Sequence, residues 1–330
     1  MIQAKHTLLY SLLSMGLLLA GLGCGDATTA KPETPAEDSK PTVPKVIEEG
    51  ESIRQINDAK IFTKVIGKGE PILIVHGGPG FNHSYLLPHF QDLAKDHQLI
   101  FYDQQGCGRS GFNSDTAKIS IAGMVEDIEA LRLDLGIDQL NLLGHSWGGL
   151  LAMNYAHTHP TRIKRLLLVS PTSGSSQMKK RDEDLARQRD NDEDRKAMMA
   201  VRGTEAFVNK EPSAFEQLFT IGFRSQFFDP SLSDSLDMNF QDNFYKSSQV
   251  LYRFMGRDLK EYNIHQALTK VKAPCLLLYG KYESTALESR AMLKAAFDNS
   301  DYVEIEKAGH FPFIEQPTDF FAAIRQFMAK

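Results

Sequence analysis

The chain has 330 residues, of which 42% are hydrophobic and 24% are charged, an ordinary composition for a soluble globular protein with a large core. Its formal net charge is -5, whereas nucleic-acid-binding proteins are usually basic along one face, so we expect no nucleic-acid partner. The ten histidines are scattered, and no CxxC or HExxH spacing occurs. We therefore expect no metal site and no cofactor.

The first 24 residues indicate an export signal. Lys5 and His6 give a short positive region, the apolar stretch LLYSLLSMGLLLAGLG follows, and Cys24 comes after small residues. This order resembles a bacterial lipoprotein signal, in which the cysteine is acylated and becomes the first residue of the mature protein. The protein is then expected to be exported and anchored to the cell envelope through Cys24, in the periplasm or at the surface. The alternatives are an ordinary cleaved secretory peptide and an uncleaved membrane anchor.

Residues 25–50 are rich in Pro, Thr, Glu, Ala and Lys and hold almost no large apolar side chains. Such a segment cannot bury enough surface to order itself, so it is predicted to be a disordered tether. The folded part is expected to begin near Glu51.

Beyond the tether, short apolar runs alternate with helical patterns. Apolar residues recur with helical spacing over 118–137, and a second helix is predicted over 150–160, closed by Pro160. The predicted strands are 71–77, 98–104, 139–145, 165–171 and 274–280, with a further strand at 301–306. This alternation predicts an α/β fold, with a mostly parallel central sheet and helices on both of its faces. In such sheets the ligand site lies at the C-terminal ends of the strands.

Residues 172–269 interrupt the alternation. They contain a mixed-charge stretch at 179–199, which is most often a solvated helix face, and two aromatic-rich stretches with helical spacing. Because the insertion starts at the C-terminal end of a predicted strand, we expect a helical cap over the ligand site rather than a thicker core. The core is then divided into residues 51–171 and 270–330.

The sequence GHSWGG at 144–149 contains a G-x-S-x-G pattern between a predicted strand and a predicted helix. In such a nucleophile elbow the serine lies on a strained turn, and the glycines remove side chains that would clash there. Ser146 is therefore the predicted nucleophile, with the positive end of the following helix beneath it. The alternative is a plain glycine-rich turn.

A serine hydroxyl is a weak nucleophile unless a base activates it, and the base needs an acid to orient it. In this architecture the chain order is Ser, acid, His. His310 is the last histidine and follows the last predicted strand, so it is the predicted base. Glu283 follows the strand at 274–280 and is the predicted acid. The alternatives are a partly buried loop histidine and an exposed turn glutamate.

The sequence HGGPG at 76–80 directly follows a predicted strand. A glycine-rich strand exit can bring a backbone N–H close to a substrate carbonyl oxygen. Gly78 is predicted as one oxyanion donor, and Trp147, the residue after the nucleophile, as the other. A tight turn without this role is the alternative.

HGGPG, DQQGCGRS, GHSWGG and GHFPFIEQP occur in this order and resemble the proline iminopeptidase branch of the α/β-hydrolases, peptidase family S33. The resemblance covers about residues 50–330, and the cap matches less closely. It implies the α/β-hydrolase fold and an aminopeptidase that releases an N-terminal residue, often proline, through an acyl-enzyme. It implies a triad of Ser146 as nucleophile, Glu283 as acid and His310 as base, with Gly78 and Trp147 as oxyanion donors.

Two departures from the family pattern keep other functions open. The sequence GKYE carries Glu283 where the family usually has aspartate, and residues 246–262 lack the Gly-Pro-x-Glu-Phe stretch with which the family's exopeptidases hold the substrate's α-ammonium. A carboxylesterase, a lactonase or another hydrolase of small amides or esters would use the same triad. A non-catalytic lipid-anchored binding protein is the alternative of another class, although it would need none of the three triad residues.

Overall fold

The computed structural model of the chain describes residues 47–330. The predicted signal at 1–24, Cys24 itself and residues 25–46 of the predicted tether lie outside this range. The described residues form one eight-stranded sheet in the order β1-β2-β4-β3-β5-β6-β7-β8. The strands are β1 (Gly50–Ile56), β2 (Ala59–Ile66), β3 (Glu70–Val75), β4 (His97–Tyr102), β5 (Leu140–His145), β6 (Ile163–Val169), β7 (Cys275–Gly280) and β8 (Ser300–Ile305). All neighbouring pairs from β4 to β8 are parallel, which confirms the predicted fold class.

Strands β1 and β2 form an antiparallel hairpin that the sequence pattern did not predict. Ile56 pairs with Ala59, so Asn57 and Asp58 make the two-residue turn, and Asn57 has a φ of 49°. Asparagine tolerates this left-handed conformation better than most residues. Strand β1 lies at the edge of the sheet and only Ile56 in it is fully buried, so its hydrophobic alternation is weak.

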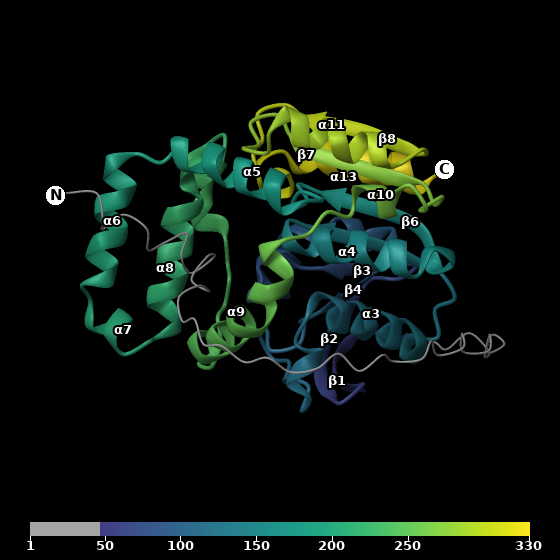
Figure 1. Ribbon diagram of the computed structural model, residues 1–330, viewed down its shortest axis with the longest axis horizontal. Coiled ribbons are helices and arrows are strands. Elements are labelled where there is room, and N and C mark those ends of the chain that lie inside the picture. The colour runs from purple at the N-terminus through teal and green to yellow at the C-terminus, as the bar shows by residue number, and fades with distance from the viewer. Residues whose placement is uncertain (1–46) are drawn as a thin grey trace, which may run out of the picture.

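Helices cover both faces of the sheet (Figure 1). Those of the core are α2 (Leu87–Phe90), α3 (Ile121–Leu135), α4 (Trp147–Thr158), α11 (Leu287–Ala296), α12 (Pro312–Glu315) and α13 (Pro317–Met328). Helix α3 begins after Ser120, whose side chain accepts a hydrogen bond from the Gly123 N–H, and it ends at Gly136 with a φ of 70°. These are the usual N-cap and C-cap arrangements, so the helix predicted over 118–137 is shorter at both ends.

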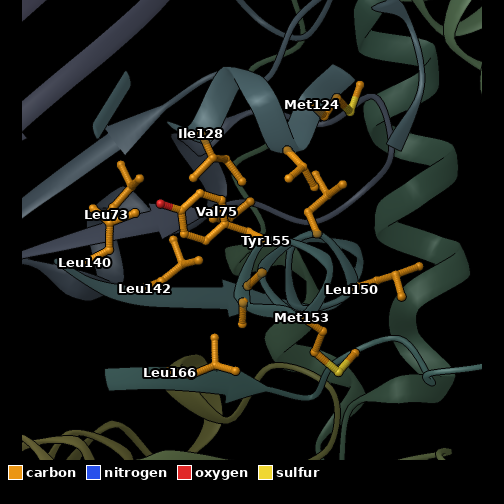
Figure 2. Packing of buried hydrophobic residues seen from close by; sticks show 14 of the residues in the cluster. Leu73, Val75, Met124, Ile128, Leu140, Leu142, Leu150, Met153, Tyr155 and Leu166 are labelled. Atoms are coloured by element: carbon orange, nitrogen blue, oxygen red, sulfur yellow. The ribbon is translucent and has the colours of Figure 1, made fainter. Parts of the chain in front are cut away.

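Alternate side chains of each central strand enter two separate hydrophobic clusters. Leu73 and Val75 of β3 join the cluster that contains residues of α3 and α4, as Figure 2 shows. Ile72 and Ile74 of the same strand join the other cluster, which contains residues of α13. Because successive side chains of a strand point to opposite faces, a strand buried on both faces is apolar throughout. This explains the continuous apolar runs in the sequence.

Six helices lie between β6 and β7, in the segment predicted as a cap. They are α5 (Ser176–Gln188), α6 (Asp192–Arg202), α7 (Glu205–Val208), α8 (Pro212–Phe223), α9 (Phe244–Lys260) and α10 (His265–Leu268). Helices α6, α7 and α8 lie beside the sheet in Figure 1, and α6 packs on α8 through a small cluster that includes Met198 and Leu218. Helix α9 returns to the core, where Leu251 and Met255 are buried. Within residues 47–330, none of the helices is long and apolar enough to cross a membrane.

Candidate active site

Ser146 stands between the end of β5 and the start of α4, with φ 56° and ψ -120°. This backbone conformation is rare for a residue with a side chain and is characteristic of strained functional turns. A Cβ on Gly144 would lie 2.4 Å from the carbonyl oxygen of Gly148, and a Cβ on Gly148 would lie 2.1 Å from that of Val75. Glycine at both positions therefore permits the close packing of strand and helix that leaves Ser146 partly exposed.

Glu283 and His310 lie side by side after two neighbouring strands. Glu283 Oε2 accepts a hydrogen bond from Nδ1 of His310 at 3.0 Å, and Oε1 accepts one from the Ser284 N–H at 3.0 Å. Burial of Glu283 by itself raises its pKa, but the His310 charge and hydrogen bond outweigh that effect, and the pKa is about 2. Glu283 is therefore a carboxylate at neutral pH. With a proton on Nδ1, the neutral His310 ring has Nε2 available as an acceptor.

Two arginines hold the backbone of the Glu283 loop. The Glu283 carbonyl accepts hydrogen bonds from Nη2 of Arg290 at 3.0 Å and from Nη2 of Arg189 at 3.2 Å. Arg290 is buried in α11 and also pairs with Glu304 at 2.9 Å. Arg189 follows α5, so a residue of the segment predicted as a cap contacts the loop that carries the predicted acid. Sequence reasoning singled out neither arginine, because neither belongs to a recognisable motif.

The peptide between Gly77 and Gly78 is fixed by its neighbours. The Gly77 carbonyl accepts a hydrogen bond from Nδ1 of His76 at 2.7 Å. A carbonyl and the following N–H point in opposite directions from one planar peptide unit, so this bond also sets the direction of the Gly78 N–H. Gly78 has a φ of 133°, which favours glycine. Burial lowers the pKa of His76 to about 4, so its ring is neutral.

Trp147 begins α4, and the first N–H groups of a helix have no partner within the helix. Within residues 47–330 the Trp147 backbone N–H therefore has no acceptor inside its own helix, as the predicted role of oxyanion donor requires. Its indole is buried and donates from Nε1 to Gln104 Oε1 at 2.9 Å. Gln104 belongs to the DQQGCGRS stretch, so this motif supports the residue after the predicted nucleophile.

The five residues predicted for the triad and the oxyanion hole all line one pocket of about 160 Å³. They are Gly78, Ser146, Trp147, Glu283 and His310. Four of the lining side chains contact one another through their rings and form an aromatic wall, here defined as Phe81, Phe219, Phe223 and Phe311. The Phe223 ring stacks on the His310 ring with a centroid separation of 6.5 Å and an interplanar angle of 12°. Because Phe219 and Phe223 belong to α8, a helix of the segment predicted as a cap forms part of the pocket.

The pocket is also lined by a charge cluster on α5, here defined as Lys179, Asp182 and Glu183. Asp182 accepts hydrogen bonds from the Ala286 N–H at 2.8 Å and from Ser289 Oγ at 3.0 Å, and Ser173 Oγ also donates to it. Burial raises the pKa of Asp182 to about 6 against the effect of these donors. The mixed-charge stretch at 179–199 is therefore not wholly a solvated face, because its N-terminal part enters the pocket. Alternating charge on a helix gives no sign of which charges are buried.

The chain matches the family model described as alpha/beta hydrolase fold over residues 70–317. It is 29% identical over 281 residues to a proline iminopeptidase of Heyndrickxia coagulans, a match that covers 79% of this chain and 91% of that protein. It is 26% identical over 308 residues to a proline iminopeptidase of Saccharolobus solfataricus, covering 86% and 92% of the two chains. The aligned regions are therefore long enough to include both the core and the inserted helices.

Solved structures with the same fold carry several different names. A proline iminopeptidase of Mycobacterium smegmatis superposes with a TM-score of 0.63 at 20% identity, covering 85% of this chain and 98% of that one. A membrane phospholipase A has a TM-score of 0.63 at 21% identity, covering 85% and 86%. The epoxide hydrolase CorEH has a TM-score of 0.61 at 18% identity, covering 86% and 99%. At these identities the likeness establishes the fold and leaves the substrate open.

Proposed function

The chain belongs to the α/β-hydrolase fold family, and we propose that it is a serine hydrolase with Ser146 as nucleophile, Glu283 as orienting acid and His310 as base. The observation that carries this proposal is the hydrogen bond between Glu283 and Nδ1 of His310 at the edge of the pocket that Ser146 lines. A buried carboxylate on one ring nitrogen fixes the tautomer of the ring and stabilises the imidazolium that forms during the reaction.

The proposed reaction is acyl transfer to Ser146 followed by hydrolysis. Nε2 of His310 takes the Ser146 hydroxyl proton as the oxygen attacks an amide or ester carbonyl, and the Glu283 carboxylate stabilises the charged ring. The N–H groups of Gly78 and Trp147 stabilise the oxyanion of the tetrahedral intermediate. His310 then gives its proton to the leaving amine or alcohol, and water hydrolyses the acyl-enzyme with the same residues in the same roles.

Within the hydrolases we favour an aminopeptidase of the proline iminopeptidase type. The similarity to proline iminopeptidases along most of the chain supports this choice. The aromatic wall suits an apolar ring or side chain next to the scissile carbonyl. A free α-ammonium needs a carboxylate, and Glu183 is the residue proposed to bind it, because Glu283 is held by His310 and Asp182 by three donors.

A carboxylesterase or lactonase with the same triad is the second candidate. The observation that favours it is the ion pair between Nζ of Lys179 and Glu183, which already supplies the Glu183 carboxylate with a cation. A substrate without an amino group would leave that pair in place. The two candidates therefore differ in whether a free amine on the substrate increases kcat/KM.

The test combines a covalent probe with a substrate panel. A fluorophosphonate should label the wild-type protein and should not label Ser146→Ala, which should also lose turnover. Persistent labelling or turnover in Ser146→Ala would exclude Ser146 as nucleophile and move the reaction to another residue. A wild-type protein with neither label nor turnover would instead favour the non-catalytic binding protein. Among substrates, prolyl and alanyl arylamides are compared with their N-acetyl forms and with p-nitrophenyl acetate. A preference for the free amine identifies the aminopeptidase, and indifference to it identifies the esterase.

A lipid anchor at Cys24 is proposed from the sequence pattern, and it lies outside the described residues. It would hold the enzyme at the cell envelope by a tether of about 25 residues, long enough to let the folded part turn freely. Radiolabelled palmitate should enter the wild-type protein in cells and should not enter Cys24→Ala. Equal labelling of both proteins, or of neither, would remove the anchor.

A further inference from the structure

A buried chain of hydrogen bonds joins the loops around the pocket. The Gly77 N–H lies 2.8 Å from Oη of Tyr85, and that oxygen lies 2.7 Å from Nδ1 of His145. Nε2 of His145 lies 2.9 Å from the carbonyl oxygen of His310. Tyr85 and His145 are each only 2% exposed. None of these contacts belongs to the proposed triad, and together they are called the Tyr85–His145 relay.

The hydrogen-bond donors and acceptors of the relay can be assigned from its neighbours. Burial, followed by the His310 charge, lowers the pKa of His145 to about 3, so the His145 ring is neutral and carries one proton. A carbonyl oxygen can only accept, so that proton is on Nε2 and Nδ1 is an acceptor. The Tyr85 hydroxyl therefore donates to Nδ1 and accepts the Gly77 N–H. Burial raises the pKa of Tyr85, which keeps the phenol protonated.

The relay touches the three segments on which the proposed chemistry depends. Gly77 precedes the proposed oxyanion donor Gly78, His145 precedes Ser146, and the last acceptor is the backbone of His310 itself. We propose that Tyr85 and His145 are positioning residues that hold the Gly78 N–H and the His310 ring in register with Ser146. This inference rests on the proposed function, because it assigns the relay to the reaction of that site.

The relay acts through its polar atoms and not only through ring packing. The Tyr85 ring also contacts Phe81, Phe311 and Phe313, with ring centroids 6.2, 6.5 and 6.3 Å away. A phenylalanine at position 85 would keep these contacts and lose only the hydroxyl. The Gly77 N–H and Nδ1 of His145 would then lack their partner, and the loop before Gly78 would be free to shift. Small displacements of catalytic groups cost large factors in rate.

Tyr85→Phe is the first test, measured with p-nitrophenyl acetate and with the rate of fluorophosphonate labelling. We expect kcat and the labelling rate to fall by about 10- to 100-fold and KM to change by less than about twofold, because the oxyanion donor acts in the transition state. Tyr102→Phe is the matched control, since Tyr102 is equally buried and its hydroxyl has no hydrogen-bond partner within residues 47–330. The control should keep wild-type kcat.

The second test asks whether the two residues act as one unit. His145→Phe keeps a ring and removes both hydrogen bonds, so its kcat should fall at least as far as that of Tyr85→Phe. The double variant Tyr85→Phe/His145→Phe should be no more than about twofold slower than His145→Phe, because both changes break the same chain. His145→Gln, whose amide can donate to the His310 carbonyl and accept from Tyr85, should recover part of the lost kcat.

The outcomes separate this inference from the proposed function. If Ser146→Ala keeps its activity or its label, the proposed function fails and the relay has no reaction to serve. If activity depends on Ser146 but Tyr85→Phe keeps kcat within about twofold of wild type, only the relay is overturned. Independent, multiplicative losses in the double variant would also overturn it, because two unconnected structural defects behave in that way.

Discussion

Oε2 of Glu283 lies 3.0 Å from Nδ1 of His310, although 26 residues separate the two in the chain. Their loops follow β7 and β8, which are parallel neighbours, so both leave the sheet at the same edge. The Glu283 carboxylate reaches the imidazole with Oε2 while its Oε1 accepts a hydrogen bond from the Ser284 N–H of its own loop. The longer side chain is thus compatible with the position that an aspartate usually occupies in the family.

Glu283→Gln should lower kcat by roughly 10³- to 10⁴-fold and leave the fold intact, because a neutral amide no longer stabilises the imidazolium or fixes the useful tautomer. Steady-state kinetics and circular dichroism measure the two effects. Glu306→Gln is the control, since Glu306 is exposed beside the same loop and pairs with Lys281. Near wild-type kcat in Glu283→Gln would move the orienting role to another acid.

Acid should destabilise the fold through two buried neutral histidines. The pKa of His76 is lowered by burial to about 4 and that of His145 to about 3, both from 6.5. Between those folded values and 6.5 the unfolded chain binds more protons, so the free energy of unfolding falls as the pH falls. The pKa of Glu283, about 2 against 4.5, acts in the same direction below 4.5.

Urea unfolding from about pH 8 to about pH 4 checks this expectation. The free energy of unfolding should be nearly constant above about pH 7 and should fall by up to about 1.4 kcal/mol per pH unit for each histidine below it. His145→Phe should lower stability at neutral pH and should make the pH dependence shallower. Burial raises the pKa of Asp182 and of Asp127 to about 6, so these two carboxyl groups stabilise the fold as the pH falls below about 6 and oppose the histidines. The contribution of His145 is therefore read from the difference between wild type and His145→Phe, and an equal pH dependence of the two proteins would contradict the assignment of the His145 ring as neutral.

The central strands could be predicted from the sequence because burial on both faces makes them largely apolar, as in β3 and β7. The hairpin of β1 and β2 could not, because β1 is an edge strand with a largely exposed surface. The Asn57–Asp58 pair between two alternating segments is the signal that could have indicated it. Edge position is a property of the assembled sheet and leaves little trace in the local pattern.

The residues of the candidate site also fall into two groups, those that could be predicted from the sequence and those that could not. Ser146, Glu283 and His310 could be located because the fold requires them in a fixed chain order at strand ends. Tyr85 and His145 could not be paired, since they are 60 positions apart in the chain and only the folded chain shows that their polar atoms meet. The relation of Arg189 to the Glu283 loop also depends on how the cap docks on the core.

Glu183→Gln tests the aminopeptidase proposal directly. If the Glu183 carboxylate binds the substrate's α-ammonium, its loss should raise KM for a prolyl arylamide by about 10- to 100-fold, the usual cost of removing a charged hydrogen-bond partner. KM for p-nitrophenyl acetate should not change, because that substrate has no amine. Asp184→Asn is the matched control, as Asp184 is the next acid on α5 and is exposed. An unchanged KM for both substrates would instead favour the esterase, and an equal rise for both would contradict a specific role in binding the amine.

Gly280→Ala tests the junction between the strand that precedes Glu283 and the loop that carries His310. A Cβ at Gly280 would lie 2.2 Å from the carbonyl oxygen of Gly309 and 2.3 Å from that of Ala308, and both atoms belong to the backbone. The loop must therefore move away from β7, which we expect to cost about 1–3 kcal/mol in the free energy of unfolding.

Because the same loop places His310 against Glu283, kcat per folded molecule should also fall in Gly280→Ala, beyond what the loss of stability explains. Gly256→Ala is the control: it lies inside α9 with no atom within 4 Å of the added Cβ. Alanine there should be neutral or should stabilise the protein by up to about 1 kcal/mol. Equal unfolding free energies and equal kcat for the two variants would show that the contact between β7 and the His310 loop is looser than the structure indicates.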